Sequence, residues 1–218
     1  MRTVRSAFWV LLIAGGFLGS VGAGFASADT IVDTGTPDGG FFGYIGYDVF
    51  VGQSVGLAFT PTANYTLDDV GVWFMSNDWD NPGRTYTLSL RESVPGSNNG
   101  MPAPMAIETW QMATAAVGWL PVLDVATSVL HPTLEAGTQY WIYAESTEEP
   151  FVDPVWVWGS SWDPYVSGEL DLAGGTGWNS GVTYGSAPGA VIHGTLVPEP
   201  MSALLLALVA LVGRRRRG

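Results

Sequence analysis

Short runs in which apolar and polar residues alternate with a period of two dominate the middle of the chain. In Thr85–Arg91, the apolar residues Tyr86, Leu88 and Leu90 fall on one face, as in a strand with one buried side. Other runs with strand-like composition are Phe41–Phe50, Val55–Thr60, Val70–Phe74, Met105–Met112, Val122–Leu130, Gln139–Ala144, Val155–Trp158 and Ala190–Leu196. Outside the two ends, apolar residues do not recur at the spacing of an amphipathic helix.

Clusters of turn-forming residues separate these runs. They lie at Thr36–Gly40, Asn81–Gly83, Ser97–Gly100, Glu135–Gly137 and Ala173–Gly175. Many short strands joined by turns predict an all-β fold, specifically an antiparallel β-sandwich of jelly-roll type.

The N-terminal end has the pattern of an export signal. Arg2 and Arg5 precede the apolar run Ala7–Leu18, and the small residues Ala26–Ala28 follow it. This order predicts a signal peptide over residues 1–28 that signal peptidase removes, so the mature chain begins outside the cytoplasm. A membrane anchor that stays uncut is the alternative, although the apolar run is short for a bilayer span.

The C-terminal end combines a motif, an apolar segment and a cluster of positive charge. Pro198, Glu199 and Pro200 precede the apolar run Met201–Gly213. Four arginines follow it: Arg214, Arg215, Arg216 and Arg217. Apolar side chains partition into a bilayer and arginines resist crossing it, so the segment predicts a transmembrane helix with a positive stop.

This arrangement resembles the PEP-CTERM sorting signal of Gram-negative bacteria, with the tail covering residues 197–218. The resemblance implies that an exosortase recognises the tail and processes it near Pro198, Glu199 and Pro200. It also implies that the apolar helix contacts the membrane before processing. A plain C-terminal anchor that is not processed is the alternative.

The segment between the two ends, residues 29–196, has the length of one domain. It holds 19 acidic and 2 basic residues, a formal charge of −17. A surface of this charge repels nucleic acid, so we expect no nucleic-acid partner. The chain has no cysteine, which excludes disulfides and thiol chemistry.

A second resemblance concerns this middle segment, over roughly residues 41–195. The resemblance rests on four segments, Phe59–Pro61, Tyr65–Val70, Tyr86–Leu90 and Leu134–Trp141. They are similar to the "choice-of-anchor" domains, extracellular β-sandwich modules attached to alternative surface-anchoring tails. The resemblance implies a sandwich fold and no assigned catalytic residues.

The turn Asn77–Asn81 is a candidate calcium site. Asp78 and Asp80 at alternate positions, with amide oxygens beside them, are the hard oxygen ligands that calcium prefers. The turn lacks the glycine and distal glutamate of an EF-hand loop. A solvated turn without a metal is the alternative.

Tryptophans gather in the C-terminal third and are candidates for stacking on sugar rings. Trp162 and Trp178 lie in loops rich in glycine, serine and aspartate, which favours their exposure. Trp156 and Trp158 share one face of a predicted strand, which favours a place in the core or in one wall of a groove.

The sequence offers few candidate catalytic residues. His131 precedes a proline and His193 lies in the last predicted strand, and neither has the context of a catalytic triad or a metal site. We therefore predict that the chain is not an enzyme, with a glycan hydrolase as the least favoured hypothesis.

The sequence thus predicts an exported protein of the Gram-negative cell surface or extracellular matrix, structural or adhesive in exopolysaccharide or biofilm. The alternative hypothesis is a carbohydrate-binding module. Exopolysaccharide is the expected partner, and calcium is the one cofactor that the sequence suggests.

Overall fold

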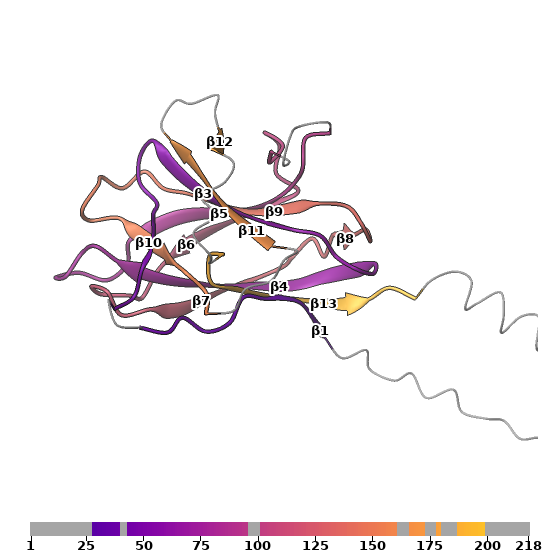
Figure 1. Ribbon diagram of the computed structural model, residues 1–218, viewed down its shortest axis with the longest axis horizontal. Helices are drawn as coiled ribbons and strands as arrows, with labels where there is room; N and C mark the ends of the chain where they lie inside the picture. The colour runs from indigo at the N-terminus through magenta and orange to yellow at the C-terminus, as the bar shows by residue number, and fades with distance from the viewer. Residues whose placement is uncertain are drawn as a thin grey trace, which may run out of the picture.

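The computed structural model describes residues 28–39, 43–95, 101–160, 166–172, 178–179 and 187–198. Within them the chain is all-β and forms two antiparallel sheets that face each other (Figure 1). The first sheet contains β1 (Asp29–Asp33), β2 (Gly46–Asp48), β4 (Tyr65–Ser76), β7 (Val122–Thr127), β8 (Thr133–Leu134), β10 (Pro154–Val157) and β13 (Ala190–Leu196). The second contains β3 (Gln53–Phe59), β5 (Thr85–Glu92), β6 (Glu108–Ala113), β9 (Tyr140–Glu145), β11 (Val166–Leu172) and β12 (Trp178–Asn179).

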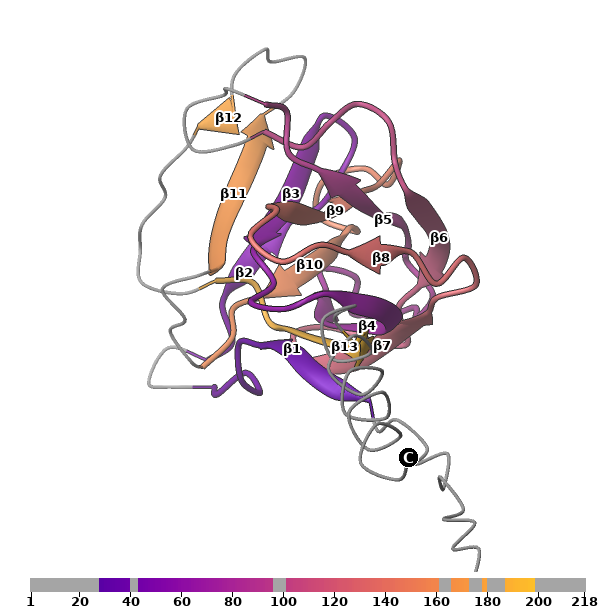
Figure 2. The ribbon, with the colours of Figure 1, turned by 90° about the vertical axis from the view of Figure 1, so that its right-hand side faces the viewer.

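Strand β4 organises the first sheet. It is the longest strand and pairs with β13, β10, β7 and β8, all antiparallel. The order along this sheet is β1-β13-β4-β10-β2, and the second sheet has the order β12-β11-β3-β9-β5-β6. Figure 2 shows β11 and β12 at one side of the second sheet and β6 at the other.

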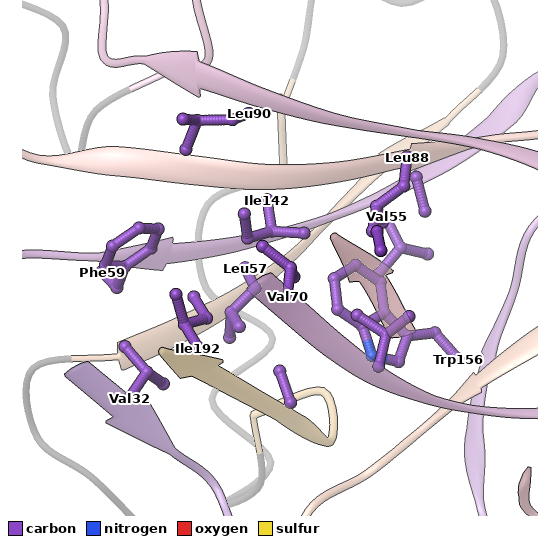
Figure 3. Packing of buried hydrophobic residues seen from close by; sticks show 14 of the residues in the cluster. Val32, Val55, Leu57, Phe59, Val70, Leu88, Leu90, Ile142, Trp156 and Ile192 are labelled. Atoms are coloured by element: carbon purple, nitrogen blue, oxygen red, sulfur yellow. The ribbon is translucent and has the colours of Figure 1, made fainter. Parts of the chain in front are cut away.

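The core lies between the two sheets. Val70, Ile192 and Trp156 from the first sheet point toward Leu57 and Ile142 from the second (Figure 3). The predicted alternation in β5 is confirmed, because its inward residues Tyr86, Leu88 and Leu90 are all buried in this core. Burial of this apolar surface is the main source of the fold's stability.

A smaller apolar cluster covers the outer face of the first sheet. Met75, Val155 and Val157 are buried there, with Tyr44 and Trp73 packed against them. This packing explains why both faces of β4 are apolar near its C-terminal end, where simple alternation would leave one face polar.

The strand register fixes two opposite poles of the sandwich. Asp29 pairs with Gly194 and Tyr65 pairs with Leu196, so β1 begins and β13 ends at the same pole (Figure 1). We call this the proximal pole. Ser76, at the other end of β4, pairs with Pro154 and marks the distal pole. Since β4 spans twelve residues, the poles are about 35 Å apart.

Most predicted strands are confirmed, but some boundaries were wrong. The predicted run Phe41–Phe50 yields only the three residues of β2, with residues 40–42 outside the described chain. The predicted run Val122–Leu130 ends at Thr127, because the Glu108 carboxylate accepts bonds from the backbone N–H groups of Val129 and Leu130 and turns the chain.

The predicted terminal helices fall almost entirely outside the described residues, since only Ala28, Val197 and Pro198 of those segments are described. In the part of the chain that the structure describes, there is no helix with the length and hydropathy to cross a membrane.

Candidate functional site

Four loops meet at the distal pole: residues 49–52, 77–84, 114–121 and 146–153. Backbone hydrogen bonds connect them, from Ser76 N–H to Gly118 O, from Asn77 N–H to Asp153 O and from Val51 N–H to Glu148 O. Loops that are tied to one another in this way hold their side chains in fixed positions, which is the usual requirement of a binding site on a β-sandwich.

Asp78 organises the loop 77–84. Its Oδ1 accepts hydrogen bonds from the backbone N–H groups of Asp80 (2.8 Å) and Asn81 (3.1 Å). Its Oδ2 accepts from Arg84 Nη2 and from the Asn81 side chain. The Asp78 side chain is only 6% exposed, whereas Asp80 is exposed. An aspartate that accepts from the N–H groups two and three residues later closes an Asx-type turn, so the local sequence itself builds this loop.

Arg84 extends the network to the neighbouring loop. Its Nη1 lies 3.4 Å from Glu148 Oε2, and Glu148 Oε1 accepts from the Thr85 N–H and hydroxyl at 2.9 Å each. The Thr85 N–H is the main cause that holds the pKa of Glu148 below its usual range. The two loops are therefore joined by a charge-assisted network.

Asn77 joins three of the four loops through its side chain. Its Oδ1 accepts a 3.0 Å hydrogen bond from Trp119 Nε1–H. Its Nδ2 donates to Asp48 Oδ1 (3.1 Å) and to Asp153 Oδ1 (3.2 Å). Because indole N–H can only donate, this contact fixes the direction of the amide and turns its NH₂ toward the two carboxylates.

Trp79 and Trp119 form an exposed aromatic pair beside this amide. Their ring centroids are 5.7 Å apart with planes tilted by 51°, and the residues remain 64% and 52% exposed. Gly118, at φ 61°, lies against the Trp79 ring, since a Cβ there would be 2.6 Å from Cε3. Two tryptophans held by a glycine contact and a hydrogen bond present aromatic surface that loses little conformational freedom on binding.

Other apolar side chains at the distal pole are also exposed. Leu120 follows Trp119, and Phe151 in loop 146–153 is 86% exposed. Phe151 has φ 74°, a left-handed conformation that is strained for a residue with a large side chain. Strain kept at an exposed aromatic residue is typical of functional loops.

A hollow of about 340 Å³ lies on the second sheet next to this pole. Its lining is mostly polar and comes from the distal ends of β5, β6 and β9 and from the start of loop 146–153: Thr85, Tyr86, Thr87, Gln111, Glu145, Ser146 and Thr147. Hydroxyl, amide and carboxylate groups of this kind are suited to hydrogen bonds with sugar hydroxyls.

The residues predicted for calcium lie at this pole but have different environments. Asp78 already uses both carboxylate oxygens within the turn, so a calcium ion would have to displace Arg84 or a backbone donor to reach it. Asp80 is free to reach solvent. Among the described residues, no group of three or more histidines, aspartates and glutamates is arranged to hold a metal ion.

Only some of the predicted aromatic and sorting residues lie in the described part of the chain. Trp156 is buried in the core and Trp158 packs against it, which confirms their predicted place. Trp178 has its backbone in β12, paired with Asp171 near the distal end of β11, and nothing is described of its side chain. Of the predicted sorting residues, only Pro198 is described, and it follows the end of β13. The remaining residues predicted for a site lie outside the described chain: Trp162, Glu199, Pro200 and Arg214 to Arg217.

The two histidines have structural partners. His131 Nδ1 lies 3.0 Å from Leu67 O, and His193 Nδ1 lies 2.7 Å from Asp69 Oδ1. His193 pairs with Asp69 across β13 and β4, on a part of the sheet away from the distal pole.

Trp79 and Trp119 were not predicted as site residues. The signal that could have found them is their setting, because each is flanked by polar or glycine-containing turn sequence, Asp78-Trp79-Asp80 and Gly118-Trp119. No protein-family model and no curated protein matches this chain.

Proposed function

We propose that this chain is an exported protein of the bacterial surface or matrix that binds a neutral polysaccharide through Trp79 and Trp119. The observation that carries the proposal is the pair of rigidly held, exposed tryptophans at the distal pole, opposite the pole where β1 begins and β13 ends. A tail attached after β13 would anchor the proximal pole, so the aromatic pair would face away from the membrane.

The charge of the distal pole sets the class of polysaccharide. This pole carries Asp48, Asp80, Glu149, Asp153 and the Asp78–Arg84–Glu148 network, and its net charge is negative. An acidic surface repels uronate- or sulfate-containing chains, whereas the aromatic rings can stack on the apolar faces of uncharged sugars.

Binding is favoured over hydrolysis. Glycosidases need two carboxylic acids that both reach the scissile bond. Asp48 and Asp153 are one close carboxylate pair at this pole, and Asp153 is completely buried. A sugar oxygen would reach it only after the loop 146–153 opened.

Export and sorting complete the proposal. We propose that residues 1–28 direct export, that an exosortase recognises residues 197–218, and that the sandwich is a jelly-roll module like the choice-of-anchor domains. In this role the protein would be a structural or adhesive part of an exopolysaccharide matrix.

The test is affinity electrophoresis of the full-length chain in gels that contain a neutral glucan, a neutral mannan or an anionic polysaccharide. If a sugar ring covers about 80 Å² of one indole, its removal weakens binding by about 2 kcal/mol, roughly 30-fold. We expect Trp79→Ala and Trp119→Ala each to weaken retardation by the neutral polysaccharides to this degree.

Leu130→Ala is the matched control, because Leu130 is another exposed apolar residue but lies beyond β7, away from the distal loops. It should bind as the unmodified chain does. Retardation by anionic polysaccharide alone, or unchanged binding by both tryptophan variants, would show that the proposed site is wrong.

A further inference from the structure

Two carboxylates at the distal pole face one another without a positive partner. Asp48 ends β2 and Asp153 directly precedes β10, and these strands pair with Asp48 opposite Val155. Because the Oδ1 atom of each lies just over 3 Å from the same Asn77 nitrogen, the two oxygens are at most about 6 Å apart. The salt bridges among the described residues involve neither of them.

Asp153 is the less usual member of the pair. Its side chain is 0% exposed, and its Oδ2 is a buried atom with no hydrogen-bond partner among the described residues. Burial raises the pKa of Asp153, and the charge of Asp48 adds to this rise. A buried carboxylate oxygen without a partner is costly, and among the described residues no donor lies within hydrogen-bonding distance of this atom.

The Asn77 amide leaves Asp153 Oδ2 unpaired and the two charges uncompensated. Its oxygen is held by Trp119 Nε1–H, and its neutral NH₂ group donates to the Oδ1 atom of each carboxylate. Two hard carboxylate ligands carry a charge of −2, which a divalent cation neutralises. Asp48 is exposed, so water can reach the ion and complete its coordination.

We propose that Asp48 and Asp153 bind a divalent cation, with calcium preferred, and that Asp153 Oδ2 is a direct ligand. Calcium accepts irregular coordination at 2.3–2.6 Å with several waters, whereas magnesium requires a near-ideal octahedron. With two carboxylates and no preformed cage, we expect a Kd of about 10⁻⁴–10⁻³ M, as in extracellular calcium modules.

The site differs from the turn that the sequence suggests. Asp78 and Asp80 belong to the loop 77–84, and Asp78 is neutralised by Arg84. Asp48 ends β2 and Asp153 ends the loop 146–153, and both carboxylates accept hydrogen bonds from the Asn77 side chain at the start of that turn. The inference does not depend on polysaccharide binding, although an ion here would hold the Asn77–Trp119 contact in place.

The experiment uses the full-length chain in detergent, first freed of metal with a chelator. Thermal melting is followed by circular dichroism in calcium and in magnesium at equal ionic strength. At tenfold excess over Kd we expect calcium to raise Tm by a few degrees and magnesium to raise it less. Terbium should give luminescence sensitised by the nearby tryptophan, and calcium should quench it by displacement.

Matched variants locate the ion. Asp48→Asn keeps the acceptor for Asn77 and removes one charge, so it should abolish the calcium-specific shift and the terbium signal. Asp80→Asn, at an exposed aspartate in the adjacent turn, should leave both unchanged. A calcium response that survives in Asp48→Asn, one lost only in Asp80→Asn, or equal shifts by both ions would overturn the proposal.

Asp153→Asn supplies a second readout. Without metal it removes a buried charge next to Asp48, so its Tm in chelator should equal or exceed that of the unmodified chain, and calcium should not raise it further. A lower Tm in chelator together with a retained calcium response would show that Asp153 serves only to hold the loop.

Discussion

Replacing Asp78 tests whether this residue holds the distal loop through its own hydrogen bonds. Asp78→Ala removes the acceptor of two backbone N–H groups and the partner of Arg84. We assign about 1 kcal/mol to each backbone bond and about 1 kcal/mol to the ion pair, since Arg84 is partly exposed and screened. The free energy of unfolding should fall by about 3 kcal/mol, which corresponds to a Tm lower by roughly 6–12 °C.

The assay is urea unfolding of the full-length chain in the presence of a chelator, so that no metal contributes. Asp78→Asn keeps a neutral acceptor for the N–H groups and loses the ion pair, so it should cost about 1–1.5 kcal/mol. The exposed Asp80→Ala should change stability by less than about 0.5 kcal/mol. If Asp78→Ala were no more destabilising than Asp80→Ala, the network would not be what holds the turn.

Four further outcomes follow from individual residues. Trp156→Ala should lower the free energy of unfolding by about 3–5 kcal/mol in denaturant titrations, because a fully buried indole leaves a cavity. Gly118→Ala should cost about 1–2 kcal/mol for its positive φ, and by displacing Trp79 it should also alter tryptophan fluorescence and weaken polysaccharide binding. Burial raises the pKa of Asp124 above its ordinary 3.8, so this carboxyl binds more protons in the folded chain than in the unfolded chain. Stability should therefore fall as the pH rises from 3.8 through that raised pKa, and unfolding titrations of Asp124→Asn should show a smaller fall. Neutral residues in place of Arg214–Arg217 should impair retention and processing, as seen by cell fractionation and by the size of the product, whereas unchanged sorting would contradict the tail hypothesis.

Local periodicity was sufficient to predict the bounds of the strands that have one buried face. β5 and β13 are placed within about one residue of the prediction because their side chains alternate between core and surface. Strands whose pairing depends on distant segments were not predicted. β1 is held by β13, and β11 is held by β3, and neither has an alternation that reveals its partner.

The candidate site was predictable only in part, since it is made by loops from four places in the sequence. The turn at Asp78 was visible as a polar cluster, but its pairing with Arg84 and Glu148 depends on the fold. Asp153 looked like one member of an acidic loop, whereas the fold buries it completely against Asn77. The exposed position of the Trp79 ring likewise depends on the fold, because the ring lies against Gly118 from another loop and no local pattern specifies that contact.

The orientation of the domain on the cell can be tested with single cysteines, because the chain has none of its own. Strand β13 ends at Leu196, and only residues 197–200 precede the predicted membrane segment, a reach of at most about 14 Å. The proximal pole would then lie close to the membrane, with the distal pole roughly 35 Å farther out.

Asp80 and Ala136 are suitable positions, since both are exposed and lie at opposite poles. Ala136 N–H donates to the Asn64 side chain, and Val197 N–H donates to Asn64 O, so Ala136 marks the proximal pole. On intact cells, a bulky membrane-impermeant maleimide should label Asp80→Cys faster than Ala136→Cys. In detergent, where the membrane no longer shields the proximal pole, the two rates should converge. The same ratio of rates on cells and in detergent would mean that the domain is not held at its proximal pole, and the aromatic pair would lose its outward orientation.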